Sequence, residues 1–267
     1  MKLSTYEQIY GRYKRLYKEN KEYAVFYSKC IKLMHQIVQD IAKIKANEYT
    51  KTKIHITGAK AMSQLYEIKI LHNFVAHQTL LKNGISIASY DHLRNIYETI
   101  IKIYLNLTHP DLGELNFKYE TSQNNKELSK EEIKKIEEEY KKERYLKTDY
   151  IEKKIYSEDM RKHTREFYHT LSGLMHPSIK SMAPCYEFRP NQFMDSFKLG
   201  IGLTIPNFII LFELYEDKIK NKYKQRLSEL LKEYPKYISE GIPNLIPSIN
   251  NNKLKINNYN KLKDILN

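Results

Sequence analysis

Apolar residues recur at intervals of three or four along most of this chain, which is the spacing that places them on one side of an α-helix. They keep this spacing over 26–44, over 62–81 and over about 87–107. Gly58 separates the first two segments, and Asn83-Gly84 is a turn signal between the second and the third. No segment alternates with the period of two that is typical of a half-buried β-strand. The pattern therefore predicts an all-α fold, a bundle of several helices.

Two capping boxes mark predicted helix starts. Ser4-Thr5-Tyr6-Glu7 and Ser129-Lys130-Glu131-Glu132 both place a carboxylate three residues after a hydroxyl. The helix after the second box, about 130–146, is almost entirely charged, so we expect it to be exposed or to project from the body. Residues 108–128 contain Pro110 and Gly113, and the sequence predicts a loop there.

The C-terminal half continues the helical pattern and then loses it. A helix over about 158–175 is predicted to end before His176-Pro177, because the residue preceding a proline disfavours helical backbone. A basic helix is predicted over about 216–231. Several prolines and asparagines follow. The predicted organisation is one all-helical domain, residues 1–233, and an irregular basic C-terminal extension, residues 234–267.

One long apolar segment needs an explanation of its own. Residues 199–212 carry no charge, within a predicted helix over 193–215. The run is shorter than the roughly 18 residues that span a bilayer. We therefore expect a buried central helix, kinked at Pro206, and no membrane segment.

Composition narrows the class further. Hydrophobic residues make up 41% of 267 positions, which is enough for a globular core and too much for a disordered chain. Two cysteines, Cys30 and Cys185, cannot build a disulfide framework, although a single bridge is open to them. Because no zinc-type spacing and no phosphate-binding loop is found, we expect no metal and no cofactor. Residues 1–7 hold no apolar signal segment, so a cytoplasmic location is expected.

The net charge of +13 favours an anionic partner, either nucleic acid, with RNA preferred, or an acidic protein. Two basic clusters interleave with tyrosines that can stack on bases. Their basic residues are Arg12, Lys14, Arg15 and Lys18 in the first cluster, and Lys222, Lys224 and Arg226 in the second. The alternative interpretation is a solvated helix face, with the tyrosines on its buried side.

Arg94 and Glu98 lie one turn apart on the helix predicted over 87–107. Ile101 and Leu105 share almost the same direction around this helix, which places Arg94 at the border of the core. An unpaired guanidinium is costly there, so Arg94 needs a partner, and Glu98 is a suitable one.

A second polar stripe lies on the helix over 158–175. It consists of Arg165, His169, Ser172 and His176, which fall within about 60° of one another around the helix axis. The stripe is predicted to lie at the rim between core and water, where histidines can act as acid, base or phosphate ligand. Two alternatives remain open: a structural hydrogen-bonded network, and non-catalytic anion binding.

These two segments resemble a poorly characterised helical family of bacteria and archaea. The resemblance rests on an Arg-x-x-x-Glu helix, here Arg94 to Glu98, and on a Tyr-x-x-Leu-Ser-x-x-x-His-Pro-Ser helix, here Tyr168 to Ser178. It covers about residues 60–215. The family has no firmly assigned activity, so the resemblance implies a fold more readily than a function.

A more distant similarity is to HEPN domains, helical bundles of which many are dimeric, metal-independent ribonucleases. Their signature places four to six residues between Arg and His, whereas Arg165 and His169 are separated by three. The resemblance implies His169 or His176 as general base, with Arg165 or Arg94 stabilising charge on the phosphate. The function hypotheses are a HEPN-like ribonuclease or defence effector acting on RNA, a non-catalytic nucleic-acid- or protein-binding module, and a helical scaffold.

Overall fold

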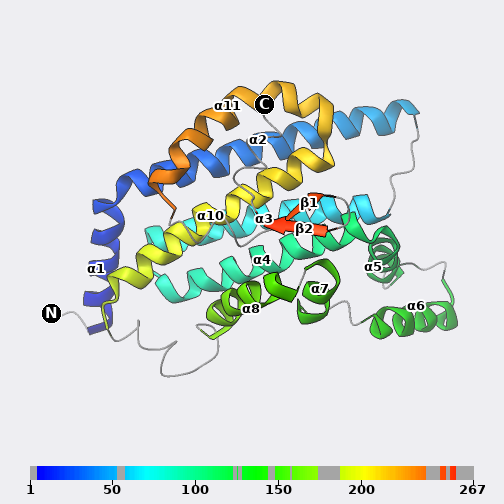
Figure 1. Cartoon of the computed structure of the whole chain (residues 1–267), viewed down its shortest axis with the longest axis horizontal. Coiled ribbons are helices and arrows are strands. Elements are labelled where there is room, and N and C mark those ends of the chain that lie inside the picture. The colour runs from blue at the N-terminus through cyan, green and yellow to red at the C-terminus, as the bar shows by residue number, and fades with distance from the viewer. Residues whose placement is uncertain are drawn as a thin grey trace.

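The computed structural model describes residues 5–52, 58–122, 125, 128–143, 148–156, 158–173, 187–238, 247–250 and 253–256. Ten α-helices lie in these ranges, which confirms the predicted all-α bundle (Figure 1). They are α1 (Thr5–Glu19), α2 (Lys21–Thr52), α3 (Gly58–Lys82), α4 (Ser86–Thr108), α5 (Pro110–Ser122), α6 (Lys130–Lys142), α7 (Thr148–Ile155), α8 (Glu158–Gly173), α10 (Pro190–Leu214) and α11 (Glu216–Glu233).

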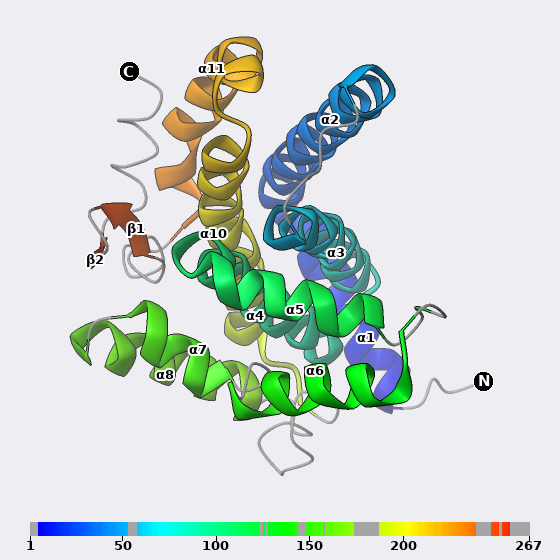
Figure 2. The same cartoon turned by 90° about the vertical axis from the view of Figure 1, so that its right-hand side faces the viewer.

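Four long helices, α2, α3, α4 and α10, run alongside one another and enclose the core (Figure 1). Helices α7 and α8 lie against α4 on the side away from α2, and α5 and α6 extend the bundle at one end (Figure 2). The turn between α3 and α4 is the predicted helix–helix connection. Gly84 adopts φ = 78° there, a conformation that L side chains rarely take.

A buried chain of polar side chains joins the four long helices. His77 of α3 contacts the Tyr27 hydroxyl through Nδ1 at 2.9 Å and the Ser196 hydroxyl through Nε2 at 3.0 Å. Ser196 of α10 also contacts the Ser89 hydroxyl of α4 at 2.8 Å. Burial, together with the charge of nearby His92, lowers the pKa of His77 to about 3, so its ring is neutral at physiological pH. The four helices are thus held in register by satisfied polar groups.

The predicted loop over 108–128 is wrong for residues 110–122, which form α5. Pro110 occupies the first turn, where its missing N–H costs nothing, and Asp111 follows it. Gly113 is helical because α5 lies very close to α3: a Cβ at Gly113 would come within 2.5 Å of the Ala59 Cβ. Pro110 and Gly113, the two turn signals in this segment, instead begin a helix and allow its close contact with α3. Helix α7 is a second helix that the sequence pattern did not predict.

The charged helix predicted over 130–146 is α6, and its capping box forms as predicted. The Ser129 hydroxyl accepts a hydrogen bond from the Glu132 N–H at 3.2 Å, and the Ser129 N–H donates to the Glu132 carboxylate at 2.8 Å. Most of α6 is exposed, yet Tyr140 is 2% exposed and stacks on Tyr119 of α5 at 3.9 Å between ring centroids. Tyr140 therefore anchors a mostly charged helix to α5, and the apolar side chains of Ile133 and Ile136 are half-buried.

Helix α10 is the long apolar helix of the sequence, and it continues through Pro206. By length and composition alone it is apolar enough to cross a membrane, the one such helix among the described residues. However, 83% of its apolar window is buried inside the protein. This burial agrees with the predicted buried central helix.

The extension predicted from residue 234 onward begins inside the core. Tyr234, in the 3-10 helix η1 (Tyr234–Lys236), is fully buried and packs edge-on against Phe26 at 5.0 Å between centroids. Tyr237 stacks on Phe26 from the other side. Residues 234–238 therefore belong to the helical body, because a 3-10 turn after α11 returns these aromatic rings to α2.

The tail predicted as irregular also contains an antiparallel pair of strands, β1 (Pro247–Asn250) and β2 (Lys253–Ile256). Its sequence signal is weak. The alternation Lys253-Leu254-Lys255-Ile256 follows the turn-forming pair Asn251-Asn252, over four residues only. The sequence also predicts a short amphipathic segment near 259–266, which lies outside the described residues.

We predict opposite effects of the same substitution at two helical glycines. A Cβ at Gly200 would lie 2.7 Å from His77 Cε1 and 2.9 Å from the Tyr27 hydroxyl, so Gly200→Ala should lower the free energy of unfolding by about 1–2 kcal/mol. A Cβ at Gly11 meets nothing within 4 Å, so Gly11→Ala should raise it by about 1 kcal/mol through helix propensity. Urea unfolding of both variants measures the difference. Equal stabilities would show that the buried chain around His77 tolerates displacement.

Candidate functional site

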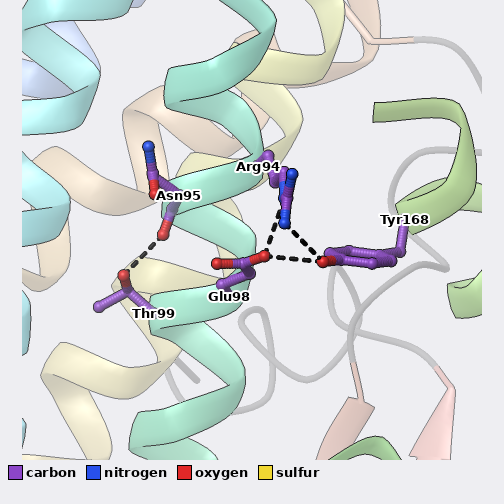
Figure 3. A network of polar contacts seen from close by, with 5 residues as sticks. All are labelled: Arg94, Asn95, Glu98, Thr99 and Tyr168. Carbon is purple, nitrogen blue, oxygen red and sulfur yellow. Dashed lines mark hydrogen bonds and ion pairs between the residues drawn. The ribbon is translucent and has the colours of Figure 1, made fainter. Parts of the chain in front are cut away.

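Arg94, Glu98 and Tyr168 form a closed triangle of hydrogen bonds where α4 meets α8 (Figure 3). Arg94 Nε donates to Glu98 Oε1 at 2.9 Å, and Arg94 Nη2 donates to the Tyr168 hydroxyl at 2.9 Å. The Tyr168 hydroxyl in turn donates to the same Glu98 oxygen at 2.9 Å. The sequence predicts the pairing of Arg94 with Glu98 and places Tyr168 in the same supporting network, whereas packing between helices decides which hydrogen bonds Tyr168 makes.

The side chains of Arg94 and Glu98 are 29% and 25% exposed, at the border of the core as predicted. Partial burial acts to lower the pKa of Arg94, but the hydrogen bond and the charge of Glu98 outweigh it and raise the pKa overall. The guanidinium also lies over the Tyr168 ring, with Cζ 5.2 Å from the centroid. Arg94 is therefore a permanent cation with a fixed orientation, and part of it faces solvent.

A second carboxylate lies beneath this triangle. Glu152 of α7 is 3% exposed and accepts a hydrogen bond from the Tyr97 hydroxyl at 2.8 Å, and the Tyr97 ring lies 6.3 Å from the Tyr168 ring. Burial raises the pKa of Glu152, while Tyr97, Arg161 and Arg165 act to lower it. Both arginines therefore lie close enough to Glu152 to feel its charge.

The predicted stripe on α8 does not share one environment. Arg165 and His169 are exposed, whereas Ser172 is 8% exposed and its hydroxyl has no hydrogen-bond partner among the described residues. His176 lies outside the described residues. A span of about 60° around a helix at the edge of a core is wide enough to run from water to the interior. The prediction of a single rim is therefore wrong for Ser172.

Three arginines and one imidazole thus gather around the junction of α4 and α8. We call Arg94, Arg161, Arg165 and His169 the α4–α8 cluster. Arg94 donates to the Tyr168 hydroxyl and the Tyr168 ring lies 6.4 Å from the His169 ring, while Arg161 and Arg165 act on the charge of Glu152. Guanidinium groups present planar, paired donors that match phosphate and carboxylate oxygens. The arrangement is suited to binding an anion. Within the described ranges, no group of three or more His, Cys, Asp or Glu side chains could hold a metal ion.

The first basic cluster lies on α1, and its Tyr13 is not available for stacking on bases. Arg12, Lys14, Arg15 and Lys18 are all exposed. Tyr13 between them is 2% exposed, accepts a hydrogen bond from the Arg189 N–H at 2.9 Å and stacks on Phe193. The alternative interpretation, a solvated basic face with tyrosines on its buried side, holds for this helix.

The second basic cluster lies on α11, where it contributes to the contact with α2. Lys222 forms an ion pair with Asp40, and Arg226 donates to Gln36 at 2.6 Å. Tyr223 is 3% exposed and donates to Asp40 at 2.5 Å. Lys224 is half-buried. These cations hold two helices together, so they are less free to contact a partner than those of α1.

No family model, no curated protein and no solved structure matches this chain.

We predict that Tyr168→Phe lowers the free energy of unfolding by about 1–2 kcal/mol, because it removes two hydrogen bonds to charged groups at a partly exposed site. The matched control is Tyr17→Phe. Tyr17 is half-buried, and its hydroxyl bonds to no described residue, so the change should stay within about 0.5 kcal/mol. Urea unfolding measures both values. A Tyr168→Phe value no larger than the control would mean that the triangle adds nothing to stability.

Proposed function

We propose that this chain binds RNA through the α4–α8 cluster. In its most specific form, the proposed function is cleavage of the RNA without a metal ion. The observation that carries the proposal is the triangle of Arg94, Glu98 and Tyr168. It fixes a half-buried guanidinium of α4 against α8, the helix that also carries Arg161, Arg165 and the exposed imidazole of His169.

The chemistry favours a phosphate ligand. Glu98 and Tyr168 occupy Nε and Nη2 of Arg94, and the part of the side chain that faces solvent is left to meet an anion. Arg165 is exposed on the neighbouring helix and adds a second guanidinium group with paired donors. A net charge of +13 would draw a polyanion to the protein before any specific contact forms. RNA is a polyanion with a phosphate at every step.

Cleavage would use the imidazole of His169. As general base it would take the proton of a ribose 2′-hydroxyl, whose oxygen would attack the adjacent phosphorus. The 5′-oxygen would leave and take a proton from water, giving a 2′,3′-cyclic phosphate and a 5′-hydroxyl end. Arg165 and Arg94 would stabilise the negative charge that develops on the phosphate oxygens. A homodimer would bring two such clusters together.

We predict that RNA binding depends on the arginines of α8 more than on those of α1. The double variant Arg161→Gln/Arg165→Gln should weaken binding of a single-stranded RNA by about tenfold or more, since each charge-assisted hydrogen bond contributes about 1.5–3 kcal/mol. It should also make the slope of log affinity against log salt shallower by about 0.7 for each phosphate that the variant no longer neutralises. Fluorescence anisotropy over a range of salt concentrations measures both quantities.

The matched control is Arg12→Gln/Arg15→Gln, which removes the same charge from the exposed face of α1. A much smaller loss of affinity is expected from it. The reverse order would assign binding to α1, and an equal, small loss from both variants would indicate general attraction to a cation-rich surface. No binding by the wild-type chain at low salt would end the proposal.

We predict that purified protein in EDTA cleaves RNA and that His169→Gln abolishes cleavage while the fold, checked by circular dichroism, is retained. Loss of the general base should slow cleavage by about 100-fold or more. The His169→Gln variant, purified in the same way, controls for a contaminating nuclease, and a cyclic phosphate at the RNA ends shows that cleavage went through the 2′-hydroxyl. Binding without cleavage would reduce the function to an RNA-binding module.

A further inference from the structure

A cavity of about 130 Å³ lies between α2, α3 and the C-terminal end of α10, among elements that take no part in the α4–α8 cluster. Its walls are mostly apolar and include Val38 and Ile41 of α2 and Leu211 of α10. Ile68 of α3 lines it and is 43% exposed, while Ala42 lines it from an exposed position on α2. These two residues mark where the cavity opens to solvent.

A buried carboxyl group without a partner lines this cavity. Glu67 is 2% exposed, and neither of its carboxylate oxygens has a hydrogen-bond partner among the described residues. Gln64, one turn before it, lines the cavity as well, and its buried Nε2 is also without a partner there. Buried polar groups in proteins are nearly always hydrogen-bonded, so two such groups at one cavity need an explanation.

No neighbouring side chain among the described residues supplies Glu67 with a positive charge. Asn207 lies within hydrogen-bonding reach of Glu67 and acts to lower the pKa of its carboxyl group, but Asn207 carries no charge and its Nδ2 donates to Met34 Sδ at 3.1 Å. Burial raises the pKa of Glu67 well above its usual value, and no described lysine or arginine acts to lower it. Burial, and then the charge of Glu67, raise the pKa of Tyr215, which also lines the cavity. The carboxyl group therefore faces an apolar cavity, and no lysine or arginine among the described residues neutralises it.

We infer that this cavity binds a small amine, with an apolar body against Val38, Ile41 and Leu211 and an ammonium group hydrogen-bonded to Glu67. An ammonium group offers three donors and the missing positive charge, which the two free oxygens of Glu67 can accept. The Gln64 Nε2 can donate to any oxygen that the ligand carries. An apolar cavity of about 150 Å³ holds one benzene molecule, so this cavity of about 130 Å³ fits an apolar body of at most about six non-hydrogen atoms, with the ammonium group beside Glu67.

The test titrates the full chain with benzylamine, followed by isothermal titration calorimetry. Benzyl alcohol serves as the neutral ligand of the same shape. Benzylamine should bind at one site with a Kd of about 0.1–1 mM, in line with the efficiency of small ligands. Benzyl alcohol should bind at least about tenfold more weakly, because it lacks the charge that Glu67 requires.

Two variants test the site itself. Glu67→Gln keeps the shape and removes the charge, so affinity for benzylamine should fall about tenfold or more, whereas Glu138→Gln on exposed α6 should leave it unchanged. Ala42→Phe, at the exposed edge of the cavity, should block binding even if the buried variant fails to fold. The inference is overturned by no saturable binding up to about 10 mM. It is also overturned by equal affinity for the alcohol, or by unchanged binding in a folded Glu67→Gln or Ala42→Phe variant.

Discussion

The rest of the structure depends on a neutral imidazole at the centre of the bundle. His77 uses both ring nitrogens, one toward Tyr27 of α2 and one toward Ser196 of α10, and Ser196 passes the connection on to α4. Apolar packing alone has little direction and allows helices to slide or rotate, whereas a buried hydrogen bond is costly to break and fixes a register. The close approach of α10 at Gly200 follows from this constraint, since no side chain fits beside the ring.

The orientation of α4 about its own axis in turn determines which groups surround Arg94. With Leu93 and Ile96 fully buried, the positions of Arg94 and Glu98 fall at the border of the core. Helix α8 then packs against this border through Tyr168, whose hydroxyl bonds to both members of the pair. The α4–α8 cluster is therefore a consequence of core packing, and its one fixed cation is Arg94, while the arginines of α8 stay more exposed.

Two buried carboxylates in this protein show opposite solutions to the same physical problem. Glu152 has a hydrogen bond from Tyr97 and two arginines nearby, so its environment partly offsets its burial. Glu67 is equally buried, yet it lines a cavity, and among the described residues only the neutral Asn207 side chain acts to lower its pKa. The first arrangement stabilises a junction between helices. The second arrangement leaves carboxylate oxygens that can accept hydrogen bonds from a ligand.

Helix periodicity and capping are local properties of a chain, and the sequence by itself determined them here. The all-α class, the turn at Gly84, the start of α6 at Ser129 and the pairing of Arg94 with Glu98 all depend on residues within one or two turns of each other. Contacts between helices determined the features that local patterns do not predict. Gly113 is helical because α3 lies beside it, and Tyr168 completes the triangle from 70 residues away along the chain. Periodicity gives the direction of a side chain around its own helix, but only the packed structure shows which helix it meets.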